Sequence, residues 1–231
     1  MPWCVIPAAG AGRRFGGDRP KQYQMLGGRP MLVRTLERLA SHPDIEGIVV
    51  AIAPDDSWWP GLHECLGKPV IATHGGEERA HSVLAGLRAL PREVAVSDWV
   101  LVHDAARPCV RHADIDHLLQ RGMMHDTGAL LAAPVRDTIK RGNAEHEAEA
   151  SVPRENLWRA FTPQLFHRGE LADALEAAIA SGVAATDEAK ALELRGKTAL
   201  LVTGSDDNLK VTSAEDLAIA EMILRRQEDE A

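Results

Sequence analysis

Short apolar runs alternate with segments of helical spacing along the chain, and this alternation constrains the fold more than any other feature. In the helical segments, leucines recur at Leu32, Leu36 and Leu39 and again at Leu171 and Leu175, with Ile179 following. The order predicts an α/β protein with a mostly parallel sheet flanked by helices, in which ligands bind beyond the carboxyl ends of the strands. The runs expected to form strands are Trp3–Ala8, Gly47–Ala53, Pro69–Thr73, Trp99–His103, Gly128–Ala133 and Thr198–Thr203.

The chain has 231 residues, which suits one large α/β domain or two small ones. Thr212 and Glu215 are spaced as a capping box, so we expect the last helix to begin there.

One segment, Arg136–Arg159, departs from the alternation because it is rich in charge and poor in apolar residues. It is also long for a connection within a compact domain. A surface loop is one interpretation. A protruding β-arm is the other, with residues 137–140 leading out and residues 151–158 returning. Leu157 and Trp158 need burial, which favours the arm.

The net charge of −8 argues against a nucleic-acid partner. The first loop region is nevertheless cationic, and a cationic segment in an acidic protein indicates a small anionic ligand. Between residues 13 and 34 the only acid is Asp18, and the cations are Arg13, Arg14, Arg19, Lys21, Arg29 and Arg34.

Location is indicated by the cysteines and by the apolar runs. Cys4, Cys65 and Cys109 share no close spacing, and nothing at the amino terminus resembles a signal peptide. No apolar run approaches the roughly 20 residues of a membrane-spanning helix. We therefore expect reduced thiols in a cytoplasmic protein without a membrane partner.

The first chemical motif is the glycine-rich segment 7–16, which follows the first expected strand and is followed by Pro20-Lys21-Gln22-Tyr23. It is not a Walker A loop, since no Gly-Lys-Ser/Thr follows, and Phe15 stands where a dinucleotide fingerprint has its third glycine. Small residues let backbone N–H groups approach a phosphate. With Arg13, Arg14 and Lys21 added, a triphosphate site is favoured over a flexible turn with solvated cations.

The second motif, Gly75–Val83, follows the third expected strand. It could hold a base or a ribose, but by itself it is explained as well by a helix start. The third motif, Val102–Pro108, places Asp104 at the carboxyl end of a strand. A ligand or Mg²⁺ role for Asp104 is favoured over a salt bridge with Arg107 that caps the strand.

Further polar clusters have structural explanations of their own. Thr186 or Asp187 suits a helix N-cap, and Lys210 suits a solvated strand end. The histidines show no metal-ligand spacing, and no Ser-His-Asp arrangement is visible. The clusters are Arg136-Asp137-Thr138, Pro153-Arg154, Thr162-Pro163-Gln164, Thr186-Asp187-Glu188 and Asn208–Thr212.

Read together, these segments resemble the 2-C-methyl-D-erythritol 4-phosphate cytidylyltransferase family. Each is modest evidence alone, but they occur in the family's order over nearly the whole chain. Glu77 stands where an Asp is common, and Phe15 where a Met is common. The segments that carry the resemblance are Pro7–Phe15, Pro20–Tyr23, Glu78–Val83, Val102–Pro108, Ala133–Thr138, Leu157–Gln164, Thr186–Ala189 and Asn208–Thr212.

The resemblance implies one nucleotidyltransferase domain over residues 1–231, with a Rossmann-like sheet and no second enzymatic domain. It also implies a homodimer in which an arm at about 134–158 reaches the other subunit. The implied CTP site comprises Pro7, Ala8, Ala9, Gly10, Ala11, Gly12, Arg13, Arg14, Lys21, Gly76, Glu77, Ser82, Asp104 and Lys210. The implied acceptor site comprises Ala105, Arg107, Thr162, Thr186 and Lys210, with Thr138 and Arg154 from the partner's arm.

The implied reaction is attack of the acceptor's phosphate oxygen on the α-phosphorus of CTP, with release of pyrophosphate. A phosphomonoester is largely ionised at neutral pH, so no general base is needed. Arg14, Lys21, Lys210 and Asp104 are the expected catalytic residues. Mg²⁺ is expected mainly on the CTP phosphates, with Asp104 as a protein ligand. A ribitol-5-phosphate cytidylyltransferase and a catalytically silent nucleotide-binding regulator are the alternatives.

Overall fold

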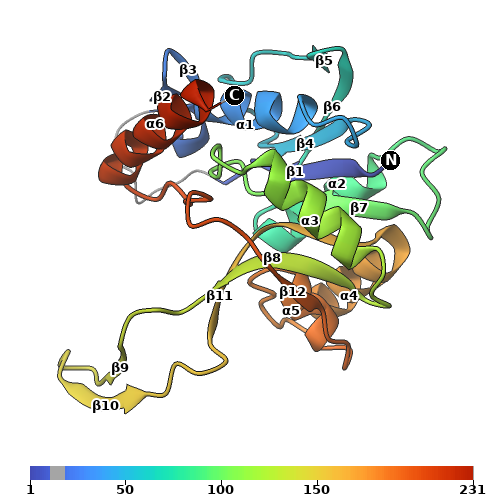
Figure 1. Ribbon diagram of the computed structural model, residues 1–231. Helices are drawn as coiled ribbons and strands as arrows, with labels where there is room; N and C mark the ends of the chain where they lie inside the picture. Colours follow the sequence, from blue (N-terminus) through green and yellow to red (C-terminus); the bar gives the residue numbers. More distant parts are fainter. Residues whose placement is uncertain (11–18, 231) are drawn as a thin grey trace.

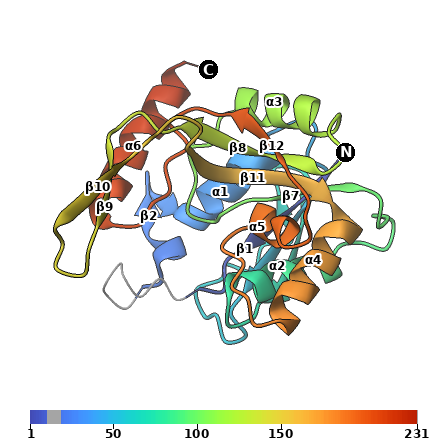
Figure 2. The same ribbon diagram turned by 90° about the horizontal axis from the view of Figure 1, so that it is seen from below.

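A single eight-stranded sheet with helices on both faces forms the body of the molecule in the computed structural model, which describes residues 1–10 and 19–230 (Figures 1 and 2). Its strands lie in the order β12-β8-β11-β7-β1-β4-β6-β5. Neighbours pair in parallel except at β11, which is antiparallel to β7 and β8, and at β5, which is antiparallel to β6. The strands are β1 (Trp3–Pro7), β4 (Ile48–Ile52), β5 (Glu64–Cys65), β6 (Lys68–His74), β7 (Trp99–Val102), β8 (Gly128–Pro134), β11 (Trp158–His167) and β12 (Leu200–Thr203).

The two faces of the sheet are covered by different helices. Alternate residues of β1 show this: Cys4 and Ile6 pack with α1 and α3, whereas Trp3 and Val5 pack with α2 and α4. The helix α6 packs beside α1, over the short pair β2 (Met25–Leu26) and β3 (Arg29–Pro30). The helices are α1 (Met31–Ala40), α2 (Arg79–Arg88), α3 (His112–Gly122), α4 (Arg168–Ala180), α5 (Glu188–Glu193) and α6 (Ala214–Asp229), and η2 (Lys21–Tyr23) is a single 3₁₀ turn.

All of the strands expected from the apolar runs are present, and the leucine-spaced segments are α1 and α4. The strand β11, which lies between β7 and β8 in the middle of the sheet, was not among the strands expected from the sequence. Pro163 and the polar Gln164 interrupt its apolar pattern, and the pairing with β8 shifts register between Ala160 and Gln164. A proline is tolerated inside a sheet at such an irregularity, so its presence concealed the strand.

The capping box of the last helix was placed one residue too early. Ser213 is the N-cap of α6, and its side chain accepts the backbone N–H of Asp216 while the Asp216 carboxylate accepts the N–H of Ser213. Thr212 also donates to Asp216, through both its N–H and its hydroxyl. The Asp216 carboxylate accepts hydrogen bonds from both Thr212 and Ser213, so the capping box is formed by Ser213 and Asp216 rather than by Thr212 and Glu215.

The charged segment forms a hairpin that projects from the body (Figure 1). Its strands are β9 (Ile139–Gly142) and β10 (Ala148–Val152), which pair antiparallel. Leu157 and Trp158, at the base of the arm, remain 36% and 37% exposed. Within one chain, therefore, the arm does not bury the two residues that favoured its prediction. Among the described residues, no helix is long and apolar enough to cross a membrane.

Candidate functional site

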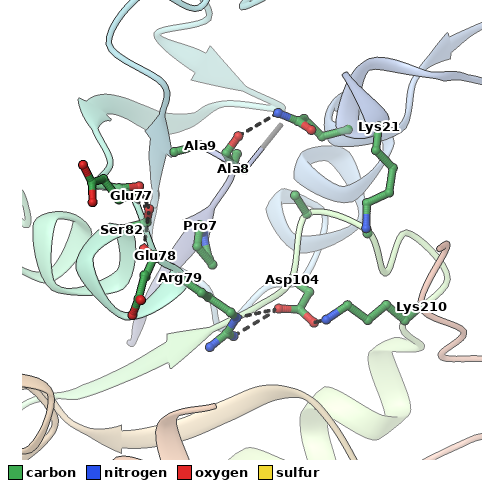
Figure 3. Close-up of a pocket in the computed structure, with 15 residues that line it drawn as sticks. Pro7, Ala8, Ala9, Lys21, Glu77, Glu78, Arg79, Ser82, Asp104 and Lys210 are labelled. Atoms are coloured by element: carbon green, nitrogen blue, oxygen red, sulfur yellow. Dashed lines mark hydrogen bonds and ion pairs between the residues drawn. The ribbon is translucent and has the colours of Figure 1, made fainter. Parts of the chain in front are cut away.

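A cavity of about 200 Å³ opens at the carboxyl ends of β1 and β7 (Figure 3). Four parts of the chain meet there: the end of β1, the η2 turn, the start of α2 and the segment after β7, with Lys210 closing one side. This is the edge at which open α/β sheets bind ligands. The lining residues are Pro7, Ala8, Ala9, Gly10, Lys21, Gln22, Gly76, Glu77, Glu78, Arg79, Ser82, Asp104, Ala105, Ala106 and Lys210.

Small residues after β1 form the floor of the cavity. Ala8 extends the β1–β4 pairing, since its N–H donates to the carbonyl of Ala51 at 2.7 Å. The Ala8 carbonyl accepts a hydrogen bond of 2.8 Å from the side chain of Gln22, which ties the η2 turn to the end of β1. Lys21 is thereby carried to the cavity, where Figure 3 shows its side chain extending toward the region of Asp104 and Lys210.

The start of α2 forms the opposite wall. A Cβ at Gly75 would lie 2.6 Å from the Ala9 Cβ and 2.7 Å from the Ser82 hydroxyl, so only glycine lets β6 turn into α2 this close to the first loop. The Ser82 hydroxyl accepts the N–H of Gly76 at 3.2 Å, which folds the Gly76 backbone toward the cavity. The N-cap Glu78 makes no side-chain capping bond to the helix, so the first N–H groups of α2 are not capped by its carboxylate.

Asp104 is the centre of charge in the site. Its carboxylate lies 3.0 Å from the Arg79 guanidinium, 2.9 Å from Lys210 and 3.5 Å from Arg107. Burial opposes ionisation, but Arg79, Lys210 and Arg107 together hold the pKa of Asp104 well below its usual range. The carboxylate is therefore charged throughout the physiological range and orients the cations around it.

Arg79 bridges two carboxylates and was not singled out from the sequence. It pairs with Asp104 and also with Glu188, the first residue of α5, whose side chain is fully buried. Burial opposes the charge on Arg79, yet Glu188 and Asp104 raise the pKa of the guanidinium above its ordinary value. Each residue stands in a segment that the sequence analysis quoted, but no local signal indicates that segments so far apart form a pair.

A buried hydrogen-bonded chain supports Asp104 from behind. The Asp104 N–H donates to the Thr162 hydroxyl at 3.0 Å, and that hydroxyl lies 3.0 Å from Nδ1 of His103. The other ring nitrogen, Nε2, lies 3.0 Å from the Arg107 carbonyl. A carbonyl only accepts, so Nε2 carries the ring proton and Nδ1 accepts from Thr162. Burial lowers the pKa of His103 to about 4, so the ring is neutral at neutral pH.

Arg107 belongs to the same buried support. Its guanidinium donates to the Asn208 carbonyl at 2.6 Å and stacks over Phe161 at 5.0 Å, while the Asn208 side chain donates to the Thr162 carbonyl at 2.7 Å. These bonds join the segment after β7 to β11 and to the loop that carries Lys210. Burial lowers the pKa of Arg107, and the neighbouring Asp104 opposes that shift.

The structure brings together most of the described residues that the sequence analysis assigned. Arg107 and Thr162 lie behind the wall rather than on it, Thr186 is exposed just before α5, and Thr138 and Arg154 lie in the arm. Asp187, not Thr186, is the N-cap of α5. Residues on the wall are Pro7, Ala8, Ala9, Gly10, Lys21, Gly76, Glu77, Ser82, Asp104, Ala105 and Lys210. Ala11, Gly12, Arg13 and Arg14 lie outside the described residues.

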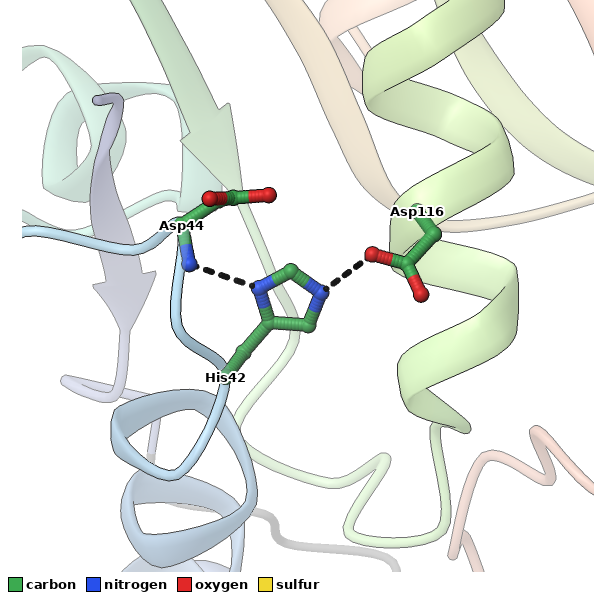
Figure 4. A group of neighbouring side chains, drawn as sticks. All are labelled: His42, Asp44 and Asp116. Atoms are coloured by element: carbon green, nitrogen blue, oxygen red, sulfur yellow. Dashed lines mark hydrogen bonds and ion pairs between the residues drawn. The ribbon is translucent and has the colours of Figure 1, made fainter.

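A separate group could hold a metal ion: His42, Asp44 and Asp116 (Figure 4). It lies between the end of α1 and α3, before β4 begins, and so at the edge of the sheet opposite the cavity. The Asp44 N–H donates to Nδ1 of His42 at 3.2 Å, and Nε2 lies 3.1 Å from Asp116. With Nδ1 accepting, the neutral ring carries its proton on Nε2 and donates it to Asp116. As bonded here, the ring joins α1 to α3 and offers no lone pair to a cation.

Comparison with known proteins identifies the family to which these features belong. The family model described as 2-C-methyl-D-erythritol 4-phosphate cytidylyltransferase matches residues 3–226. A protein of that name from Xanthomonas oryzae pv. oryzae (strain PXO99A) is 54% identical over 225 residues, which cover 97% of this chain and 83% of the relative. Another from Stenotrophomonas maltophilia (strain R551-3) is 52% identical, with 97% of both chains covered.

Solved structures agree with this comparison over the whole fold. A crystal structure of a 4-diphosphocytidyl-2C-methyl-D-erythritol synthase superposes with a TM-score of 0.84 at 33% identity and covers 96% of this chain and 98% of the other. The 2-C-methyl-D-erythritol 4-phosphate cytidylyltransferase of Francisella tularensis superposes with a TM-score of 0.83 at 32% identity and covers 96% and 99%. The mostly parallel sheet and its flanking helices are therefore shared with these proteins.

Proposed function

The chain belongs to the 2-C-methyl-D-erythritol 4-phosphate cytidylyltransferase family, a family of nucleotidyltransferases in non-mevalonate isoprenoid biosynthesis, and on that premise we propose that its chemistry takes place in the cavity around Asp104. The reaction transfers CMP from CTP to 2-C-methyl-D-erythritol 4-phosphate, giving 4-diphosphocytidyl-2-C-methyl-D-erythritol and pyrophosphate. The observation that carries the proposal is the convergence of Lys21, Arg79 and Lys210 beside the small residues that follow β1.

Those cations address the main obstacle to the reaction, which is the approach of two anions. Two unit charges about 4 Å apart repel by about 1 kcal/mol in water and by about 4 kcal/mol at an effective dielectric constant of about 20. The acceptor's phosphate is already ionised, so the enzyme must position it and offset charge rather than remove a proton. A cavity rich in cations at the carboxyl edge of the sheet suits that task.

We assign roles to individual residues on this basis. Arg14 and Lys21 offset the charge that develops at the α-phosphate, with Gly10, Ala11, Gly12 and Arg13 holding the triphosphate. Lys210 supports both substrates from the far side of the cavity. Asp104 keeps Lys210 and Arg79 oriented, because its carboxylate contacts both.

Cytidine fits the wall between the end of β1 and the start of α2. Ala8, Ala9 and Gly76 leave space for a pyrimidine, and Glu77 and Ser82 offer polar groups. Because the turn at Gly75 is closely packed against Ala9, a larger purine ring has little room to displace this wall. The acceptor occupies the side of the cavity near Ala105 and Thr186. Arg107 and Thr162 lie behind this side and contribute by holding Asp104 in position.

The residues present also suit a divalent cation held mainly by the nucleotide. When bound, such a cation would offset the charge of the CTP phosphates. Asp104 is the protein ligand that we propose, since it is an ionised carboxylate on the wall. Its oxygens already face Arg79 and Lys210, which is why we place most of the coordination on CTP.

We further propose that the protein acts as a homodimer through the arm at about 134–158. Exposed Leu157 and Trp158 at the base of the arm support this, because a two-fold partner would bury them reciprocally. Thr138 and Arg154 would then serve the acceptor site of the partner. The three cysteines are free and buried, in keeping with action in the cytoplasm. The net negative charge argues against a nucleic-acid partner.

Pyrophosphate release is the measurement that tests the proposed function. With CTP, Mg²⁺ and 2-C-methyl-D-erythritol 4-phosphate, the protein should release pyrophosphate, and kcat/KM should be much lower with ATP as donor. Faster release with ribitol 5-phosphate would assign the acceptor to the alternative cytidylyltransferase. Nucleotide binding without release for either acceptor would indicate a silent regulator instead.

A further inference from the structure

The η2 turn that carries Lys21 has little stability of its own. It spans only Lys21–Tyr23, and the backbone bonds that define it run from Tyr23 N–H to the Pro20 carbonyl at 2.9 Å and from Gln24 N–H to the Lys21 carbonyl at 3.1 Å. Short 3₁₀ turns have poorer hydrogen-bond geometry than α-helices and are seldom stable alone. The position of Lys21 therefore depends on contacts between this turn and the rest of the domain.

One such contact comes from residues 53–59, which follow β4 and contain none of the proposed substrate-binding residues. The buried hydroxyl of Tyr23 donates a hydrogen bond of 2.8 Å to Oδ2 of Asp56. The other oxygen, Oδ1, accepts the N–H of Trp58 at 3.0 Å. The carboxylate thus holds its own loop with one oxygen and the Lys21 turn with the other. Burial and the nearby Asp56 carboxylate both raise the pKa of Tyr23, so its hydroxyl remains a donor.

The same loop also contacts the chain on the other side of Lys21. The Arg19 guanidinium lies over the Trp58 ring, 5.1 Å from its centroid, and the Arg19 carbonyl accepts a bond of 2.9 Å from the Gln24 side chain. Residues before and after Lys21 are therefore fastened to one short segment. Since that segment extends β4, it connects the Lys21 turn to the rigid sheet.

From these contacts we propose that Asp56 is a positioning residue, which acts through Tyr23 to hold Lys21 in place for transfer of the nucleotidyl group. The inference rests on the proposed function for its effect on rate. Asp56 is not among the residues that line the cavity, so we place it in neither substrate site. Its contribution should appear in the rate of the chemical step, because a misplaced Lys21 loses the interaction that it makes in the transition state.

The test uses Tyr23→Phe, which removes one hydroxyl and keeps the buried ring. We expect kcat to fall about tenfold, the loss that follows when a hydrogen bond to a charged group no longer supports the transition state, with little change in KM for CTP. Asp56→Ala should act in the same direction. The matched control is Asp116→Ala, which removes a side-chain hydrogen bond of 3.1 Å at the opposite edge of the sheet and should leave kcat unchanged.

A second experiment distinguishes a positioning role from a loss of stability. In a Lys21→Ala background, Tyr23→Phe should change the residual rate by less than about twofold, because residues that act through one group are not additive. A full additional loss in that background, or a kcat for Tyr23→Phe equal to that of the control, would overturn the proposal.

A third measurement does not depend on turnover. In Tyr23→Phe, hydrogen exchange in a peptide covering residues 20–26 should be faster than in the wild type, whereas Asp116→Ala should leave it unchanged. If the wild type released no pyrophosphate, the proposed function would fail, and the exchange data would still decide whether Asp56 holds the turn. Unchanged exchange in Tyr23→Phe would contradict that role.

Discussion

The Lys210 ammonium lies 2.9 Å from the Asp104 carboxylate, and the two side chains differ sharply in burial: Lys210 is 43% exposed and Asp104 is 10% exposed. The pair joins the loop after β12 to the end of β7 across the mouth of the cavity (Figure 3). Asp104 is also fixed by Arg79 and by its backbone bond to Thr162. Lys210 can therefore move to a ligand while Asp104 stays in place.

This difference predicts opposite consequences for the two residues. Lys210→Ala should lower kcat/KM about a hundredfold but cost under about 1 kcal/mol of stability, since Lys210 itself is partly exposed and Asp104 keeps Arg79 and Arg107 as counter-charges. Asp104→Asn should destabilise by about 3 kcal/mol, because Arg79 and Arg107 lose a buried counter-charge. Steady-state kinetics and urea unfolding of both variants check this. Equal losses of stability would show that the pair is structural.

The neutral His103 predicts a pH dependence of stability. Its pKa is lowered from the ordinary 6.5 to about 4, so the unfolded chain binds a proton between these values and the folded chain does not. Stability should therefore fall as the pH drops from about 6.5 to about 4, by up to roughly 3 kcal/mol from this residue. The free energy of unfolding, measured with urea across that pH range, should depend less steeply on pH for His103→Gln than for the wild type. Parallel curves for variant and wild type would rule the assignment out.

The buried pair of Arg79 and Glu188 predicts strong coupling. Arg79→Leu leaves the fully buried Glu188 without its counter-charge, which should cost about 3–5 kcal/mol, and adding Glu188→Leu should restore part of that loss. The control is the exposed pair of Arg88 and Glu176, which lie 2.8 Å apart and join α2 to α4. Arg88→Leu should cost under about 1 kcal/mol. Additive losses at Arg79 and Glu188 would contradict the coupling.

The sequence predicted the parts of the fold that depend on local pattern. Apolar runs located the strands β1, β4, β6, β7, β8 and β12, and leucine spacing located the helices α1 and α4, because burial imposes continuous apolar runs on such strands and a helical spacing on the buried face of a helix. The central strand β11 escaped because Pro163 breaks its pattern, and only its pairing with β7 and β8 makes it a strand.

The site divides in the same way. Ala8 and Asp104 could be found because they stand at the ends of expected strands, and Lys21 because it belongs to the cationic segment that follows the first of these strands. Arg79 could not be given its role, because its partner Glu188 is far along the chain and neither residue reveals the other. A long-range ion pair depends on how two helices pack against each other, and the sequence of one segment does not specify that packing.

Arg154, which lies in the arm, does not line the cavity of its own chain. Instead, the Arg154 guanidinium donates to the Arg136 carbonyl within the arm, and both Arg154 and Thr138 are exposed. A planar guanidinium can grip a phosphate with two hydrogen bonds and offset its charge. If Arg154 serves the partner's acceptor, Arg154→Ala should lower activity severely. Arg141→Ala, at an exposed arginine on β9, should not.

Mixed dimers decide in which subunit Arg154 acts. Arg154→Ala and Lys21→Ala should each retain only a small residual activity alone. If the arm and the Lys21 turn of a site come from different chains, a heterodimer of the two has one site with both defects and one site with neither. Activity should return after subunit exchange toward half the wild-type value per heterodimer. Heterodimers that are demonstrated to form but remain inactive, or a protein that is monomeric at the assay concentration, would show that Arg154 does not act on the neighbouring site.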